Sequence, residues 1–351
     1  MTQDPAISVR GLWQVFGSDA ASAFARAQTQ KGPGTPDPGA LAQTLKKQGL
    51  IPAVRDANFD VAEGELFVIM GLSGSGKSTL IRGISRLVEP TSGQVQIHGE
   101  DVLAASKARM TELRRTQIGM VFQHFGLFPH LSVLDNVAFP LKVGGMSRKE
   151  RHAKALPILE MVGLSGRETA FPRELSGGQR QRVGIARSLA GDCSVWFLDE
   201  PFSALDPLIR RQLQDEFLDI RKRLNTTIVF ITHDITEALK LADRIAIMRD
   251  GVIEQIGTPT DIVLNPVNDY VREFSRDVAR GRHAQVASVM QTGDASANPA
   301  GPALRPDMTL EDALAVCMRH YDPVPVHGSD GAVLGMVHPT DLARALQAET
   351  A

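Results

Sequence analysis

Residues 66–79 read LFVIMGLSGSGKST, and this stretch decides the fold. The apolar run 66–70 predicts a strand that is buried on both faces of a mostly parallel sheet. Residues 71–78 match the phosphate-binding pattern G-x-x-x-x-G-K-[ST], with a helix expected to follow. Glycines allow backbone N–H groups to point at phosphates, and the helix N-terminus adds a partial positive charge. The sequence therefore predicts a nucleotide site formed by Gly71, Ser73, Gly74, Ser75, Gly76, Lys77, Ser78 and Thr79.

Two side chains of this loop and two later carboxylates carry the expected chemistry. Lys77 is placed to reach the β- and γ-phosphates, and Ser78 is placed to bind Mg²⁺. A second apolar run, 195–198, leads directly into Asp199 and Glu200. A carboxylate at the end of a buried strand suits the Mg²⁺ shell, which is the predicted role of Asp199. Glu200 would polarise the attacking water as a general base. The alternative is a solvated acidic loop.

The remaining apolar segments complete a mixed α/β pattern. Residues 228–231 form another continuous apolar run, which predicts a further buried strand. Residues 93–99 and 245–251 alternate between apolar and other residues, so we expect half-exposed strands there, with a turn at Asp250 and Gly251. Helical patterns lie between the strands. This alternation predicts a nucleotide-binding α/β architecture.

A second phosphate-seeking segment follows the loop by about a hundred residues. Leu175 to Gln179 read LSGGQ and precede an amphipathic helix pattern, so Ser176, Gly177, Gly178 and Gln179 should lie at a helix N-terminus. Such an end offers free N–H groups, a hydroxyl and a helix dipole to an anion. Two such surfaces on one chain suggest that two copies meet head to tail with ATP between them. The alternative is an ordinary serine N-cap followed by two glycines.

Together these motifs resemble the ATP-binding subunit of an ABC transporter, from about Ile7 to Arg276. The resemblance implies a P-loop ABC ATPase domain with a mostly parallel sheet core, an antiparallel β subdomain and a helical subdomain. It also implies ATP and Mg²⁺ as cofactors, with Ser78, Gln123 and Asp199 near the metal. Asp206 resembles the D-loop aspartate, and Phe16 the aromatic that stacks on adenine, with Trp13 as a competing aromatic. The implied catalytic set is Glu200, His233, Gln123 and Lys77.

Four features resemble one group within this family, the glycine betaine/proline betaine importers. They are residues 88–93, 202–210, 265–271 and the insertion before Val54. This likeness implies transport of quaternary amines such as glycine betaine, proline betaine or choline. It also implies three partners: a second copy of the chain, integral membrane permease subunits and a separate solute-binding protein. Residues 123–140 would then lead towards the permease, with Phe125, Leu127 and Phe128 either in a docking groove or in the core.

Several alternatives remain beside this interpretation. The chain could serve an importer for another small solute, such as an amino acid, act as a soluble ABC ATPase on DNA or ribosomes, or sense nucleotides through its tail. The net charge of −2 does not favour nucleic acid as a partner. No run of about 18 uncharged apolar residues is present, so we expect a peripheral position on the cytoplasmic face of the inner membrane, through the permease.

Changes in composition predict the domain organisation. We expect an ABC domain over 1–277, with an insertion at 17–52 that forms a loop plus one short helix near 40–48, and a helical subdomain over about 124–190. A linker over 278–306 would precede a small α+β unit at 307–351, which resembles one CBS motif and begins a helix after Thr309. A lone CBS motif would either pair with its copy in the dimer or be a vestige. Cys193 and Cys317 are expected to be small buried side chains.

Overall fold

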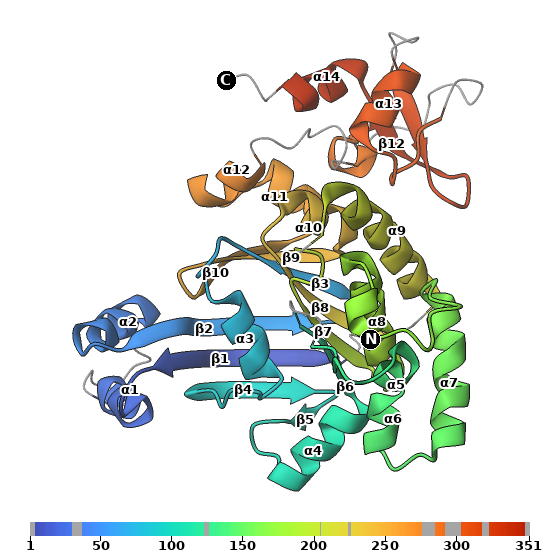
Figure 1. Ribbon diagram of the computed structural model, residues 1–351. Coiled ribbons are helices and arrows are strands. Elements are labelled where there is room, and N and C mark those ends of the chain that lie inside the picture. Colours follow the sequence, from blue (N-terminus) through green and yellow to red (C-terminus); the bar gives the residue numbers. More distant parts are fainter. Residues whose placement is uncertain are drawn as a thin grey trace. The chain divides into compact units, whose positions relative to one another are not determined.

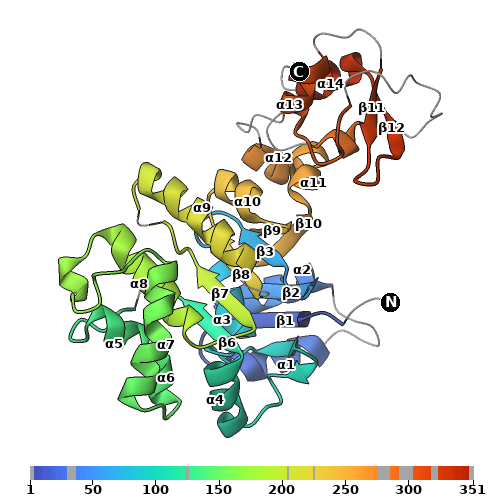
Figure 2. The same ribbon diagram turned by 90° about the vertical axis from the view of Figure 1, so that its right-hand side faces the viewer.

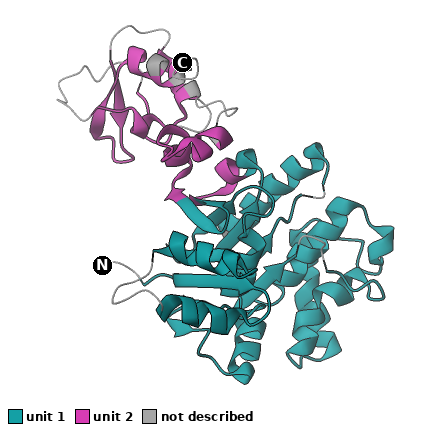
Figure 3. Cartoon of the chain, turned by 90° about the vertical axis from the view of Figure 1, so that its left-hand side faces the viewer, with its two compact units in different colours: residues 1–237, 246–254 teal, residues 238–245, 255–351 magenta. Residues whose placement is uncertain are grey.

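The computed structural model describes residues 4–29, 37–122, 126–203, 205–223, 226–275, 285–291, 303–317 and 323–347. Contacts divide the chain into two compact units, coloured separately in Figure 3. The first comprises residues 1–237 and 246–254, and the second comprises residues 238–245 and 255–351. Among the described residues, no helix combines the length and the apolar character needed to cross a membrane.

A six-stranded sheet forms the centre of the nucleotide-binding fold (Figure 1). Its strand order is β10-β9-β3-β8-β7-β6, and β3, β8, β7 and β6 run parallel to one another. Every residue of β3, β7 and β8 is buried, which confirms the strands predicted from continuous apolar runs. The strands are β3 (Leu66–Met70), β6 (Ile118–Val121), β7 (Val195–Asp199), β8 (Thr227–Thr232), β9 (Arg244–Arg249) and β10 (Val252–Gly257).

Strand β9 differs from the half-exposed strand that its alternating sequence predicts. Its four central residues, 245–248, are all buried, because β9 lies inside the sheet between β10 and β3. The turn predicted at Asp250 and Gly251 is present, and both residues have positive φ angles of 47° and 85°. These are the angles that a two-residue hairpin with the favoured twist requires.

A second, antiparallel sheet has the order β2-β1-β4-β5. It comprises β1 (Ile7–Phe16), β2 (Ile51–Val61), β4 (Ser92–Ile97) and β5 (Glu100–Asp101). Strands β1 and β2 pair along their length, from Ile7 opposite Val61 to Phe16 opposite Ile51. Strand β4 alternates between buried and exposed residues at its far end, as predicted for a strand with one solvated face.

The insertion between β1 and β2 contains two helices, whereas a loop and one short helix were expected. Helix α2 (Pro38–Lys47) corresponds to the expected helix, and α1 (Ala20–Thr29) was not predicted. The two helices share a core with β1, in which the ring centroids of Trp13 and Phe24 are 5.2 Å apart. Helix α1 forms because its alanines and Phe24 find this core, a contact that the local sequence does not reveal. Residues 30–36 lie outside the described part of the chain.

Helices α5, α6, α7 and α8 gather on the opposite side of the first unit from α1 and α2 (Figures 1 and 2). This is the region in which the sequence predicts a helical subdomain. The helices and turns outside the insertion are α3 (Lys77–Ile84), α4 (Lys107–Thr116), α5 (Val133–Val137), α6 (Phe139–Val143), α7 (Arg148–Met161), η1 (Pro172–Glu174), α8 (Gly177–Leu189), α9 (Pro207–Arg223) and α10 (Ile235–Leu241).

The C-terminal unit has its own apolar core and begins earlier than residue 307. Val286 and Leu304, which fall in the expected linker, are completely buried in this core together with Leu310 and Val326. Backbone bridges also join Gln285 to Thr309 and the neighbourhood of Leu304 to β11. Its elements are α11 (Pro259–Leu264), α12 (Asp269–Ser275), η3 (Val286–Ser288), α13 (Leu310–Cys317), β11 (Val324–His327), β12 (Val333–Val337) and α14 (Pro339–Gln347).

The start of α13 is confirmed as the sequence predicts. The Thr309 hydroxyl accepts a hydrogen bond from the Asp312 backbone N–H at 3.1 Å. This is the contact that an N-cap threonine makes with the first helical turn.

Candidate nucleotide site

The phosphate-binding loop leaves the end of β3 and enters α3 at Lys77. Gly76, the residue before the helix, has a φ of 102°, and a Cβ atom added to it would lie 2.3 Å from the Ala53 carbonyl oxygen. A Cβ atom on Gly71 would lie 2.2 Å from the Met248 carbonyl oxygen. Neighbouring strands therefore approach the loop so closely at these two positions that a residue with a side chain could not occupy either of them without moving the backbone.

Lys77 lies across the loop and is 4 % exposed. Its ammonium group donates hydrogen bonds to the carbonyl oxygens of Gly71 at 2.8 Å and Leu72 at 3.0 Å. Burial lowers the pKa of Lys77, while the negative charges of Glu200 and Asp199 act in the opposite direction. A phosphate beside the ammonium group would raise its pKa and so favour the charged form. Lys77 is therefore in a position where a bound anion would stabilise its positive charge.

Ser78 and Asp199 meet although 121 residues separate them in the chain. The Ser78 hydroxyl donates a hydrogen bond to Asp199 Oδ1 at 2.8 Å. The other carboxylate oxygen of Asp199 lies 3.6 Å from the Arg82 guanidinium, and the Asp199 side chain is 4 % exposed. A hydroxyl and a buried carboxylate, both oxygen donors, are thus brought together beside the phosphate loop.

Glu200 follows β7 with a φ of 46°, a conformation that is uncommon for a residue with a side chain. Its backbone N–H donates to the Ile231 carbonyl oxygen on β8 at 3.1 Å. The carboxylate Oε2 lies 3.2 Å from His233 Nδ1, which is at the end of the neighbouring strand. The parallel pairing of β7 and β8 therefore brings together Glu200, the predicted general base, and His233, another residue of the implied catalytic set.

An open cleft of about 320 Å³ lies over the loop. Glu200 faces this cleft together with loop residues that the sequence singled out, and Ala53 from β2 completes one wall. The lining residues are Ala53, Ser73, Gly74, Gly76, Lys77, Ser78, Thr79 and Glu200. The segment Ser176–Gln179 does not contribute to this lining.

The two competing aromatic residues of β1 have different environments. Trp13 is 4 % exposed and packs against Phe24 in the core of the insertion. Phe16, the last residue of β1, is 40 % exposed, and its cross-strand partner Ile51 is 64 % exposed. Of these two aromatic rings, that of Phe16 is the exposed one and that of Trp13 is enclosed.

The LSGGQ segment begins α8 as an N-cap. The Ser176 hydroxyl accepts from the Gln179 N–H at 3.3 Å, and the Gln179 side chain accepts from the Ser176 N–H at 3.0 Å. Gly178 lies against α9, since a Cβ atom there would come within 2.8 Å of the Ile209 side chain. Asp206 in turn caps α9 by accepting from the backbone N–H groups of Leu208 and Ile209.

Gln123 lies outside the described residues, as does Phe125. Two further residues near the loop were missed by the sequence reasoning. Arg82 lies four positions after Ser78 on α3, a spacing that places both on one helix face and was a usable signal. Ala53 had no signal in its residue type, because its place beside the loop depends on the pairing of β1 and β2.

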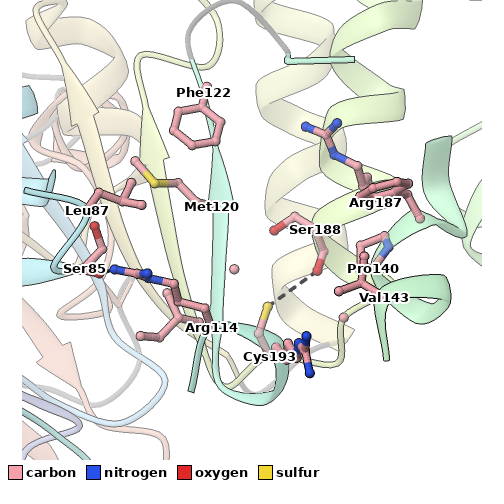
Figure 4. A pocket seen from close by; sticks show the side chains of 15 residues that line it. Ser85, Leu87, Arg114, Met120, Phe122, Pro140, Val143, Arg187, Ser188 and Cys193 are labelled. Carbon is pink, nitrogen blue, oxygen red and sulfur yellow. Dashed lines mark hydrogen bonds between the residues drawn. The ribbon is translucent and has the colours of Figure 1, made fainter. Parts of the chain in front are cut away.

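A second cavity, of about 270 Å³, lies elsewhere in the first unit (Figure 4). It brings together apolar side chains from β6 and α6, and Figure 4 shows Arg114 and Arg187 on opposite sides of it. Three of its apolar residues are substantially exposed: Leu87, Phe122 and Val143. Phe128, for which the sequence left a docking groove and core packing open, packs against Phe139, a residue of the cavity lining, with ring centroids 4.3 Å apart.

Cys193 forms part of the wall of this cavity. Burial raises the pKa of its thiol to about 12, so the group stays protonated at neutral pH. Cys193 and Cys317 are both free and buried, which confirms that they are small core side chains.

Comparisons with known proteins agree with this geometry. Residues 54–203 match the ABC transporter family, and residues 287–348 match the CBS domain. The chain is 47% identical over 97% of its length to the trimethylamine N-oxide transport system ATP-binding protein TmoW of Pelagibacter ubique, of which it covers 96%. It is 41% identical over 98% of its length to the glycine betaine transport ATP-binding protein OpuAA of Bacillus subtilis, of which it covers 78%.

A solved structure extends the comparison to the fold. The ATP-binding cassette MJ0796, solved as a dimer in a post-hydrolysis state bound to ADP and Pi, is 32% identical with a TM-score of 0.58. The match covers 72% of this chain and 98% of that one. The family relationship thus extends over nearly the whole sequence and includes the phosphate loop, the strand that ends in Asp199 and the C-terminal core. The chain therefore belongs to the ABC transporter family, as an ATP-binding subunit that carries a C-terminal CBS domain.

Proposed function

We propose that two copies of this chain enclose two ATP molecules, each between the phosphate loop of one copy and the start of α8 in the other. The observation that carries this proposal is the lining of the cleft over the loop, to which Ser176–Gln179 do not contribute. A second anion-binding helix end on the same chain is then free to serve a nucleotide bound to another copy. The dimeric state of the related cassette MJ0796 supports this arrangement.

The loop residues have the chemistry that the phosphates of ATP require. Lys77 now donates to two loop carbonyls, and a phosphate oxygen offers a charged acceptor in their place. Ser78 and Asp199 present the hydroxyl and carboxylate oxygens that Mg²⁺ prefers, so these two residues would hold the metal. When bound, Mg²⁺ neutralises charge that develops on the transferred phosphoryl group. Gln123 is assigned to the same site from the sequence.

Hydrolysis requires a water held in line with the γ-phosphate, and Glu200 is the proposed base. Its carboxylate is largely buried but borders the cleft, and Oε2 lies 3.2 Å from His233 Nδ1. A carboxylate within hydrogen-bond reach of the water can accept its proton as the O–P bond forms. His233 orients this carboxylate and is placed at the strand end from which it would contact the γ-phosphate. Phe16 stacks on the adenine.

The variant Glu200→Gln tests the sandwich. Removing the base while keeping the side-chain shape should allow ATP to bind and the dimer to close, while hydrolysis falls by about 10²- to 10⁴-fold, the usual contribution of general-base catalysis. Size-exclusion chromatography with ATP should then show a stable dimer, and with ADP a monomer. A variant that remained monomeric with ATP and kept normal turnover would contradict the proposed mechanism.

The cavity beside β6 is proposed as the docking site for the permease subunit. It combines exposed apolar side chains with arginines at positions 114, 115 and 187, which together suit an amphipathic helix bearing acidic residues. Docking here would hold the chain at the cytoplasmic face of the inner membrane. Val143→Glu should abolish co-purification with the permease and leave ATP-driven dimerisation intact; retained co-purification would reject this docking site.

The transported solute is proposed to be a small, fully substituted amine. The supporting relatives serve trimethylamine N-oxide and glycine betaine transport, and both solutes carry a methylated nitrogen with four substituents. A separate solute-binding protein and the permease would recognise this group. In the reconstituted complex, trimethylamine N-oxide and glycine betaine should stimulate ATP hydrolysis, whereas unrelated amino acids should not. Stimulation by an amino acid, without stimulation by either methylated amine, would contradict this proposed solute.

A further inference from the structure

Arg210, in the first turn of α9, contacts both the segment that contains Asp206 and the segment that contains His233. Its Nη2 atom donates to the carbonyl oxygens of Leu205 at 3.2 Å and Ser203 at 3.5 Å, both in the segment that contains Asp206. Its Nη1 atom lies 3.3 Å from Asp234 Oδ2, on the segment that contains His233. The Arg210 side chain is 25 % exposed and that of Asp234 is 32 % exposed, so their contact is partly buried.

The Asp234 end of this contact is fixed to the histidine. Asp234 Oδ1 accepts from the N–H groups of Thr236 at 2.9 Å and Glu237 at 3.2 Å, which caps α10. The Asp234 backbone N–H donates to the Thr232 hydroxyl at 3.0 Å. His233 is therefore held between two residues whose positions are set by hydrogen bonds. A shift of His233 must also move the carboxylate that Arg210 contacts.

The segment around Asp206, which Arg210 contacts on its other side, is also held by hydrogen bonds. Asp206 caps α9 with its side chain, and its carbonyl oxygen accepts from the Arg210 backbone N–H at 2.9 Å. One turn further along α9, Gln214 donates to the Glu237 carboxylate at 2.9 Å. Helix α9 is thus joined to α10 and to the residue before it at two levels, by Arg210 with Asp234 and by Gln214 with Glu237.

We propose that Arg210 is a positioning residue that couples the two nucleotide sites of the dimer. The inference rests on the proposed function, in which His233 contacts the γ-phosphate of its own copy and the start of α8 serves the nucleotide of the other copy. The segment around Asp206 lies beside that helix start, since a Cβ atom on Gly177 would be 3.5 Å from the Leu205 side chain. The Arg210 side chain contacts both segments directly. Its charge is attracted to Asp234 and to two carbonyl oxygens at once, so a displacement on one side changes the contacts on the other.

A purely structural ion pair between α9 and α10 is the simpler explanation for these contacts, and it makes a different prediction. Removing such a pair lowers stability and changes nothing else. The Arg210 contacts, at 3.2–3.5 Å, are at the long end of the hydrogen-bond range, so their contribution to stability is expected to be small. If Arg210 couples the sites, its removal should lower the cooperativity of ATP hydrolysis even in a variant that folds normally.

The experiment measures ATP hydrolysis by the full-length chain as a function of ATP concentration. With two interacting sites, the wild-type Hill coefficient should approach about 2, and Arg210→Gln should lower it to about 1 with a fall of about tenfold in kcat. Arg210→Lys, which keeps the charge, should restore part of the cooperativity. ATP binding to the monomer, measured by titration calorimetry, should remain within about twofold because Arg210 does not border the cleft.

Arg182→Gln is the matched control. Arg182 on α8 donates to the Val162 carbonyl oxygen at 2.9 Å and to Glu216 on α9 at 2.7 Å, and it is 19 % exposed. It therefore has the same chemistry and similar burial, and among the described residues its hydrogen bonds go to Val162 and Glu216 and not to the segments around Asp206 or His233. This variant should keep the wild-type Hill coefficient even if its stability falls.

Asp234→Asn guards against a folding defect in the arginine variant. Asparagine caps helices as well as aspartate does, so α10 should persist while the attraction to Arg210 is lost. Cooperativity should fall as in Arg210→Gln, and the double variant should be no worse than either single one.

A cooperative wild type with an equally cooperative Arg210→Gln would overturn this proposal alone, as would an equal loss in Arg182→Gln. A wild-type chain that neither dimerises nor hydrolyses ATP would overturn the proposed function, and this inference with it.

Discussion

Phe16→Ala and Trp13→Ala should separate ATP binding from stability. Trp13 is 4 % exposed and packs on Phe24, so its truncation leaves a cavity in the insertion core and should cost about 3–5 kcal/mol of unfolding free energy. Phe16 is 40 % exposed at the end of its strand, and its truncation should cost about 0.5 kcal/mol.

The effects on nucleotide binding should be reversed. Stacking of one base on an aromatic ring contributes about 1–3 kcal/mol by alanine substitution. Because about 1.4 kcal/mol corresponds to a factor of ten, Phe16→Ala should weaken ATP binding by roughly 5- to 150-fold. Phe16→Tyr keeps the ring and should retain the affinity. Inorganic tripolyphosphate, which lacks a base, should bind Phe16→Ala as it binds the wild type.

Titration calorimetry with ATP and with tripolyphosphate gives the two affinities, and urea unfolding of the same proteins gives the stability. Trp13→Phe serves as the control, since it keeps an aromatic ring in the core. The reasoning would be refuted if Phe16→Ala bound ATP within about twofold of the wild type, well below the range expected for stacking. It would also be refuted if Trp13→Phe lost ATP affinity without losing stability.

Two further predictions concern stability. Burial raises the pKa of Glu237, so the folded chain holds this proton more tightly than the unfolded chain does. The stabilisation that comes from the protonated Glu237 carboxyl group is fully present below the unfolded pKa of about 4.3. It is lost as the pH rises through the folded pKa. Glu237→Gln should therefore be more stable than the wild type at pH 8 and not at pH 4, as measured by urea unfolding; identical pH profiles would disprove this. Gly178→Ala should lose about 1–3 kcal/mol, because its Cβ would lie 2.8 Å from Ile209. Gly177→Ala, whose nearest contact would be at 3.5 Å, should lose none, and equal losses would contradict the packing argument.

The sequence was most informative where structure and chemistry are local. The phosphate loop and its strand are contiguous in the chain, so a residue pattern sufficed to predict β3, the turn and the start of α3. The same holds for β7, which ends in Asp199 as its apolar run predicted. In both cases the residues that decide the conformation are adjacent to those that carry the chemistry.

The errors arose where burial depends on distant segments. Helix α1 packs against Trp13 from β1, and the sequence of residues 20–29 alone does not predict this contact. Strand β9 looked half-exposed because its sequence alternates, but its place inside the sheet buries both faces. Val286 and Leu304 are isolated apolar residues in a polar stretch, and only the later strands of the C-terminal unit reveal their core positions. Local periodicity carries no record of such partners.

The start of α8 shows that the two interpretations of LSGGQ describe the same physical feature. The Ser176 hydroxyl and the Gln179 side chain satisfy one another's backbone N–H groups, at distances of 3.3 and 3.0 Å. A neutral cap of this kind contributes about 1 kcal/mol. A phosphate at the same helix end would accept from the same N–H groups through stronger, charge-assisted bonds. The cap is therefore the resting form of the proposed anion site, and exchanging it for a γ-phosphate costs little. Closure of the dimer should then depend on the charge of ATP more than on contacts between the two protein surfaces.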